Sequence, residues 1–213
     1  MTTPFEAGPD VHPPSGPPPT FIDFLLDETG SMRSCAAATR SGFDDFVAAQ
    51  RGEPGGCFLT LSKFDSEGVR TPYENLRIAA VPPLSFFPGQ KTNLFDCMGE
   101  RLKAVVAQER EGRSMFVVMT DGDDNASTSW TVVRVRALVL EAQSRGIGVL
   151  YLGPPGNAAQ VGEMLGIPAG CVRPFSTTRM RETMEEVSAV VTAFRAGADA
   201  GAGFSEENHN EDR

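Results

Sequence analysis

The sequence predicts an α/β fold in which helices cover both faces of a mainly parallel β-sheet. The first observation is a series of short apolar runs, such as SMFVVMT at residues 114–120, which are typical of buried strands. The second is that segments with apolar residues at helical spacing separate most of these runs. The third is that 40% of the 213 residues are hydrophobic, which is enough for the core of one domain. Strands that alternate with helices favour a parallel sheet covered on both faces.

The predicted strands are short and apolar, and glycine, proline or polar residues flank them. They lie at residues 21–26, 57–65, 69–78, 114–120, 147–153 and, as a brief strand, 171–175. The predicted helices repeat apolar residues at every third or fourth position. They lie at residues 32–47, 94–108, 130–144, 158–165 and 178–194. RGEPGG ends the first helix, and a loop broken by prolines precedes the second.

The two ends of the chain differ in composition from its centre. Residues 1–19 contain seven prolines, which predicts an extended, disordered leader. Residues 196–213 are small, polar and acidic, which predicts a disordered tail. The sequence therefore predicts one folded domain at residues 20–195.

The charge distribution argues against a nucleic-acid ligand. Of the formal net charge of -9, -4 lies in residues 196–213 and -2 in residues 1–19, which leaves -3 for the predicted domain. A surface without a basic footprint does not attract phosphate. No apolar run approaches the roughly 18 residues that a membrane span needs. We therefore predict neither nucleic acid nor membrane as a partner.

Cysteine and histidine positions limit the chemistry further. The four cysteines are scattered without CxxC spacing, which predicts reduced thiols in a cytoplasmic protein rather than a disulfide framework or a zinc site. No secretory signal precedes the first strand. Both histidines, His12 and His209, lie in the predicted disordered ends. Catalysis by histidine is therefore not expected in the folded domain.

Three separate segments place oxygen-bearing side chains where they can meet. Asp27 follows the first predicted strand, with Thr29 and Ser31 next to it in DETGS, and Asp121 follows the strand at 114–120. Thr92 lies in the loop before the second helix. Ligands of such sheets bind beyond the carboxyl ends of the strands, so both aspartates are expected at one edge. Carboxylates and hydroxyls are hard donors that suit Mg²⁺ or Mn²⁺, with Ca²⁺ as a further candidate.

Each of these residues also has a simpler local interpretation. Thr29 or Ser31 could cap the helix that follows, and Thr92 could cap the helix that begins NLFD. Asp121 could be a turn residue in TDGDDN, because Asp-Gly favours bends. Three such coincidences in this order, each at a strand end or loop, are less probable than one shared site.

The order and spacing of these residues resemble the metal-ion-dependent adhesion site of von Willebrand factor A-type domains. That site combines an Asp-x-Ser-x-Ser stretch with a distant threonine and a distant Thr-Asp-Gly aspartate. The matching residues here are Asp27-Glu28-Thr29-Gly30-Ser31, Thr92 and Asp121. Thr29 replaces the usual serine, which keeps the oxygen and adds a methyl group. LLDETGSM, VVMTDGDDNAS and YLGPPGNAAQVGEMLGI look closest to the compact bacterial and phage members of the family.

The resemblance covers about residues 21–194 and implies a doubly wound sheet of six strands. It also implies metal-dependent binding of a protein partner, without catalysis. A metal held largely by neutral oxygens stays electrophilic, so we expect the partner to supply an acidic side chain. Glu28, Asp123 and Trp130 are candidates for the rim that contacts it. Each has a plainer alternative, as a solvated acid or, for Trp130, as a packing residue at the start of a helix.

A magnesium-dependent phosphohydrolase is the alternative function. Phosphatases of the haloacid-dehalogenase type carry a second aspartate two residues after the first, where this chain has Thr29. Neither GxxxxGK[ST] nor a GxGxxG after the first strand is present. Two acids and magnesium can activate water, but the folded domain has no histidine to assist them. The sequence therefore favours a binding module over an enzyme.

Overall fold

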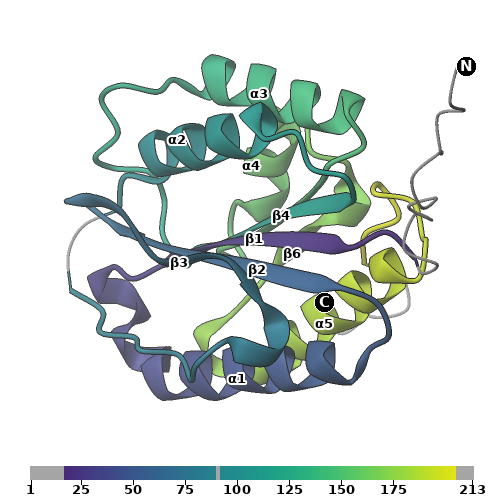
Figure 1. Cartoon of the computed structure of the whole chain (residues 1–213). Helices are drawn as coiled ribbons and strands as arrows, with labels where there is room; N and C mark the ends of the chain where they lie inside the picture. Colours follow the sequence, from purple (N-terminus) through teal and green to yellow (C-terminus); the bar gives the residue numbers. More distant parts are fainter. Residues whose placement is uncertain (1–16, 90–91, 205–213) are drawn as a thin grey trace, which may run out of the picture.

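The computed structural model describes residues 17–89 and 92–204, and a six-stranded sheet forms its centre (Figure 1). The strands are β1 Thr20–Asp27, β2 Cys57–Asp65, β3 Gly68–Arg77, β4 Arg113–Met119, β5 Gly148–Gly153 and β6 Val172–Pro174. Their order is β3-β2-β1-β4-β5-β6, and all neighbours are parallel except β2 and β3. The predicted doubly wound, mainly parallel sheet is confirmed.

Helices cover both faces of this sheet. They are α1 Ala36–Gly52, α2 Leu94–Ala107, α3 Val132–Ser144, α4 Ala158–Leu165 and α5 Met180–Arg195. Short 3₁₀ helices are η1 Gly30–Cys35, η2 Ile78–Ala80, η3 Ala169–Cys171 and η4 Thr177–Arg179. Figure 1 shows α1 and α5 together on one face, with α2, α3 and α4 on the other. This arrangement leaves the carboxyl ends of β1 and β4 side by side at one edge.

Aromatic packing fixes the first helix on the sheet. The ring of Phe24 in β1 meets Phe43 and Phe46 of α1 edge-on, with centroids 5.5 and 5.9 Å apart. Such edge-to-face pairs add about 0.5–1.5 kcal/mol beyond the area that they bury. Gly42 of α1 lies against Met184 of α5, where a Cβ atom would be 2.9 Å from the methionine Cγ. These contacts pack α1 against both β1 and α5.

The first helix starts later than its apolar pattern predicts. The pattern begins at residue 32, but residues 30–35 form η1 and α1 begins at Ala36. Thr29 before η1 has an extended backbone, with φ -77° and ψ 170°. The chain thus completes a turn at the end of β1 before it becomes an α-helix, and this turn carries the hydroxyls of DETGS.

The packed structure extends beyond the predicted domain end at residue 195. Phe204 is only 7% exposed, its backbone N–H donates to the carbonyl of Gly170 at 2.6 Å, and the Arg173 guanidinium lies 5.1 Å from its ring centre. Just before the predicted domain start at residue 20, the carbonyl of Pro19 accepts a hydrogen bond from the backbone N–H of Arg113. Phe204 therefore anchors the chain beyond residue 195 to the folded domain. The rest of the predicted disordered ends, 1–16 and 205–213, lies outside the described residues.

Replacing Phe204 with alanine is expected to lower the free energy of unfolding by about 3 kcal/mol, because a buried ring is lost. Urea unfolding of the full chain measures the change. Phe87→Ala is the matched control, since Phe87 is 78% exposed and its truncation should have almost no effect. Equal free energies for the two variants would show that Phe204 does not belong to the core.

Cys35, Cys57, Cys97 and Cys171 are buried and free of disulfide bonds. In the part of the chain that the structure describes, no helix combines the length and apolar character that crossing a membrane requires.

Candidate functional site

Side chains from the ends of β1 and β4 meet directly at one edge of the sheet. The Ser31 hydroxyl donates a hydrogen bond to Oδ1 of Asp121 at 2.6 Å, and this contact joins residues 90 positions apart. The hydroxyl oxygens of Ser31 and Thr29 lie 3.0 Å apart. Asp27 is the last residue of β1, and Asp121 lies two positions beyond β4. The structure thus brings the DETGS segment and the TDG aspartate together.

Asp27 is buried and held by two hydrogen bonds. Its Oδ1 accepts from the backbone N–H of Thr29 at 2.7 Å, and its Oδ2 accepts from the Thr120 hydroxyl at 2.6 Å. The Thr120 hydroxyl is also 3.1 Å from the carbonyl oxygen of Gly122, so it ties the first aspartate to the second loop. Thr120 was not among the predicted site residues. The signal in the sequence was a hydroxyl residue at the end of an apolar strand, directly before Asp121.

Thr92 reaches the same edge from the loop before α2. Its side chain lies beside Gly122, where an added Cβ atom would be 3.0 Å from the threonine Oγ1. Its carbonyl accepts a hydrogen bond from the backbone of Asn125 at 3.2 Å. Gly122 therefore lets the loop after β4 approach the threonine closely. The structure thus joins Asp27, Thr29, Ser31 and Asp121 by hydrogen bonds and places Thr92 beside the loop that carries Asp121.

Helix capping does not explain the two threonines. Thr29 is the residue before η1, and its side chain makes no capping hydrogen bond there. Asn93, not Thr92, precedes α2, and its side chain makes no capping bond either. The hydroxyl of Ser31 contacts Asp121 rather than only its own turn. The local interpretations therefore account for these residues less well than a shared site does.

Burial raises the pKa values of both aspartates of the site. Burial raises the pKa of Asp27 to about 6, against the hydrogen bonds from Thr120 and Thr29, and the charge of Asp121 raises it further. Burial also raises the pKa of Asp121, and the bond from Ser31 opposes this. Two ionised carboxylates at this edge repel each other and lack full hydration. A divalent cation between them would offset both penalties.

The donor set fits a hard cation with water among its ligands. In the described ranges, 17–89 and 92–204, no group of three or more His, Cys, Asp or Glu side chains could hold a metal ion. The cluster instead offers two carboxylates and three hydroxyls, and oxygen donors of this kind suit Mg²⁺ with retained water. A metal here would depend on the hydroxyls as well as the acids.

The structure places Glu28 in the interior and not at the predicted solvated rim. Its side chain is not solvated, because the residue is only 3% exposed. Its Oε1 accepts from the Lys63 ammonium at 2.8 Å and from the backbone N–H of Phe87 at 2.7 Å, and its Oε2 accepts from Arg70 at 3.0 Å. The prediction failed because cations on β2 and β3 lie beside the end of β1. The signal was Lys63 within the otherwise apolar strand CFLTLSKFD.

The other two rim candidates differ from each other. Asp123 is exposed and accepts a hydrogen bond from the Asn157 side chain. Trp130 lies before α3 and is half-buried, its ring packs against Gly99 of α2 so closely that a Cβ atom there would clash, and the Arg134 guanidinium lies 4.5 Å from the ring centre. Trp130 therefore has the packing role that was its alternative interpretation, whereas Asp123 lies at the surface.

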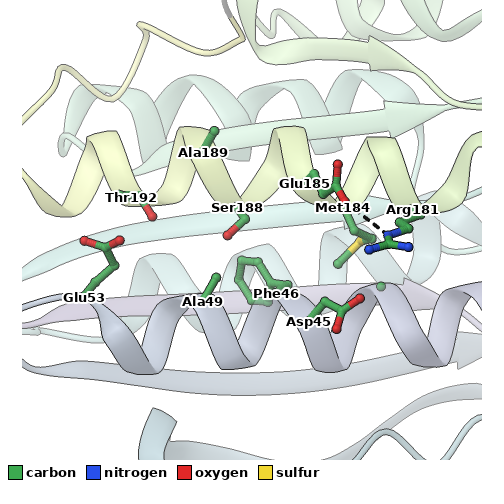
Figure 2. A pocket seen from close by; sticks show the side chains of 11 residues that line it. Asp45, Phe46, Ala49, Glu53, Arg181, Met184, Glu185, Ser188, Ala189 and Thr192 are labelled. Carbon is green, nitrogen blue, oxygen red and sulfur yellow. Dashed lines mark hydrogen bonds and ion pairs between the residues drawn. The ribbon is translucent and has the colours of Figure 1, made fainter.

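A separate depression of about 310 Å³ lies between α1 and α5 (Figure 2). Phe46 and Met184 contribute its apolar part, and Asp45, Glu53 and the ion-paired Glu185 are its acidic residues. None of the predicted site residues lines it. The candidate site is therefore the oxygen cluster at the sheet edge and not this groove.

Comparison with known proteins identifies the architecture. No family model and no curated protein matches the sequence, but solved structures resemble the fold. The ArnB paralog VWA2 from Sulfolobus acidocaldarius matches with a TM-score of 0.57 and 16% identity, over 80% of this chain and 45% of that chain. A von Willebrand factor type A structure from Catenulispora acidiphila matches with a TM-score of 0.53 and 13% identity, over 81% and 42%.

A third likeness is to the pilus adhesin SpaC from Lactobacillus rhamnosus GG, with a TM-score of 0.65 and 14% identity, over 82% of this chain and 31% of that chain. This chain thus spans less than half the length of each of these three proteins. At such identities the comparisons concern the fold. Together with the strand order, they show that the chain has the fold of a von Willebrand factor A-type domain.

Proposed function

We propose that this chain is a metal-dependent protein-binding module of the cytoplasm. One divalent cation, Mg²⁺ or in its place Mn²⁺ or Ca²⁺, joins the oxygen cluster to an acidic side chain of a partner protein. The observation that carries the proposal is the contact between Ser31 and Asp121 at 2.6 Å. It places a hydroxyl and a carboxylate from separate segments at one point, next to Thr29 and Asp27.

The proposed metal ligands leave a coordination position for a side chain of the partner. Asp27, Thr29, Ser31, Thr92 and Asp121 are the proposed metal ligands, directly or through water. Mg²⁺ takes six ligands in octahedral geometry, so five protein groups leave at least one position open. Hydroxyl and water ligands neutralise less charge than carboxylates would, and the site keeps affinity for an anionic oxygen. A glutamate or aspartate of the partner supplies that oxygen.

We propose binding without catalysis. The cluster holds acids and hydroxyls, and both histidines of the chain fall outside the described residues. Burial raises the pKa of Asp27 to about 6, into the range of a general base, but the proposal assigns this carboxylate to the metal. Magnesium-dependent turnover of a generic phosphate ester that disappears in Asp27→Asn would favour the phosphohydrolase alternative instead.

Partner retention is expected to require both magnesium and Asp121. The immobilised full chain should retain a host protein in magnesium and release it in chelator. Asp121→Ala should abolish retention, whereas Thr92→Ala should weaken it less, because water replaces a neutral hydroxyl ligand. The measurement is a titration of the purified partner against each variant, in magnesium and in chelator.

Asp45→Ala is the control for that titration, because Asp45 is an exposed acid of α1 in the separate groove. It should bind the partner as the unaltered protein does. Binding that survives chelation and both site substitutions would mean that the partner uses another surface.

A further inference from the structure

We propose that Thr120 is a positioning residue, whose hydroxyl fixes the two proposed aspartate ligands relative to each other and thereby sets the metal affinity of the cluster. This inference rests on the proposed function, and it gives Thr120 no contact with the metal. Thr120 follows β4 and directly precedes Asp121. The residue is 0% exposed, so water does not compete for the hydrogen bonds of its hydroxyl.

The Thr120 hydroxyl holds the proposed ligand at the end of β1. It donates to Oδ2 of Asp27 at 2.6 Å, while the backbone N–H of Thr29 donates to Oδ1 at 2.7 Å. The carboxylate is thus held at both oxygens, which fixes its rotation. Each oxygen has two lone-pair positions, so these bonds leave room for a cation or its water. A hydrogen bond to an ionised carboxylate is roughly twice as strong as one between neutral groups.

The same hydroxyl also holds the loop that carries Asp121. Its oxygen accepts a hydrogen bond from the backbone N–H of Gly122 at 3.2 Å. Gly122 directly follows Asp121 and lies beside Thr92, where an added Cβ atom would be 3.0 Å from the threonine Oγ1. One buried hydroxyl therefore links the carboxylate of Asp27 to the backbone on both sides of Asp121.

This link matters because metal affinity depends on how the ligands are held before the cation binds. Groups that orient metal ligands from outside the ligand shell typically change metal affinity 10- to 100-fold when they are replaced. Ser31 also joins the two segments, through its 2.6 Å bond to Asp121, but it is exposed and is itself a proposed ligand. Replacing Thr120 should instead lower metal affinity without removing a ligand.

Three substitutions of Thr120 separate its hydroxyl from its volume. The probe is Mn²⁺, titrated into the full chain and followed by the electron paramagnetic resonance signal of the free ion. Thr120→Val nearly keeps the shape without the hydroxyl, and it should weaken Mn²⁺ binding about tenfold. Thr120→Ser keeps the donor and acceptor, and it should bind Mn²⁺ within about threefold of the unaltered protein. Thr120→Ala should repeat the loss, and it replaces the valine variant if circular dichroism shows that variant unfolded.

Thr60→Val is the matched control. Thr60 is a buried threonine of β2, and its hydroxyl oxygen accepts a hydrogen bond from the backbone N–H of Asn75 at 3.0 Å. Its neighbour in β1 is Asp23, four residues before Asp27 and about 13 Å from it along the strand. Thr60→Val removes a buried hydroxyl away from the cluster, and it should leave Mn²⁺ affinity within about twofold of the unaltered protein.

The outcomes are distinct. Unchanged or tighter Mn²⁺ binding by folded Thr120→Val or Thr120→Ala, with normal binding by the unaltered chain, overturns the positioning role alone. An equal loss in Thr120→Ser or in Thr60→Val also overturns it, because the loss would then not depend on this hydroxyl. Failure of both the valine and the alanine variant to fold would make the hydroxyl structural and would overturn the role too. Failure of the unaltered chain to bind Mn²⁺ overturns the proposed function as well.

Discussion

Replacing Glu28 with alanine is expected to lower the free energy of unfolding by about 3–5 kcal/mol. The reason is that the charged ammonium group of Lys63 remains in the interior after its partner is removed. The Lys63 side chain is 10% exposed, and without Glu28 its ammonium keeps only the neutral carbonyl of Ser85 among these partners. The backbone N–H of Phe87 also loses its acceptor. Chemical unfolding in chelator measures this loss in the free energy of unfolding without any contribution from metal.

Glu111→Ala provides the control, because Glu111 is an exposed acid before β4 and its removal should change stability by less than about 0.5 kcal/mol. Adding Lys63→Met to Glu28→Ala should recover part of the loss, since the unpaired buried charge disappears. A loss in Glu28→Ala no larger than that in Glu111→Ala would contradict the buried ion pair.

In chelator, Asp27→Asn is expected to be more stable than the unaltered protein at pH 8, by about 3 kcal/mol. Burial raises the pKa of Asp27 from 3.8 to about 6 in the folded state. A raised carboxyl pKa means that the folded state holds its proton more tightly than the unfolded chain does. Its contribution therefore favours folding below pH 3.8 and is lost as the pH rises toward 6.

The asparagine variant removes this charge and keeps the geometry. Its side-chain oxygen can accept from the Thr29 N–H, and its amide can donate to Thr120, whose hydroxyl then donates to Gly122. Unfolding free energies of both proteins from pH 4 to 8 should diverge as Asp27 ionises. A variant that is less stable than the unaltered protein at pH 8 would mean that Asp27 carries no uncompensated charge.

The sequence predicted the sheet well because β1, β2, β4 and β5 are buried on both faces. Apolar runs such as 57–65 and 114–120 are hard to mistake when polar turns flank them, and the carboxyl-end rule then placed Asp27 and Asp121 at one edge. The start of α1 was less predictable. The apolar pattern continues through residues 32–35, and it does not distinguish a 3₁₀ turn from an α-helix.

The rim was harder to predict, because the sequence does not show which way a side chain points once a strand has ended. Glu28 follows the buried strand β1, and nothing in DETGS shows that its side chain turns toward β2 and β3 instead of solvent. Lys63 was a usable signal, since a lone cation in an apolar strand needs a partner. Gly99 was another, because a glycine within a helix often marks close packing, here of Trp130.

The central claim is that the cluster binds one divalent cation, and direct titration of Mn²⁺ into the full chain tests it. We expect one Mn²⁺ site per chain, and we expect Mg²⁺ to displace Mn²⁺ from it. We also expect that Asp27→Asn and Asp121→Ala each lose this site while Asp45→Ala retains it. No binding by the unaltered chain, or binding that persists unchanged in both site variants, would contradict the account.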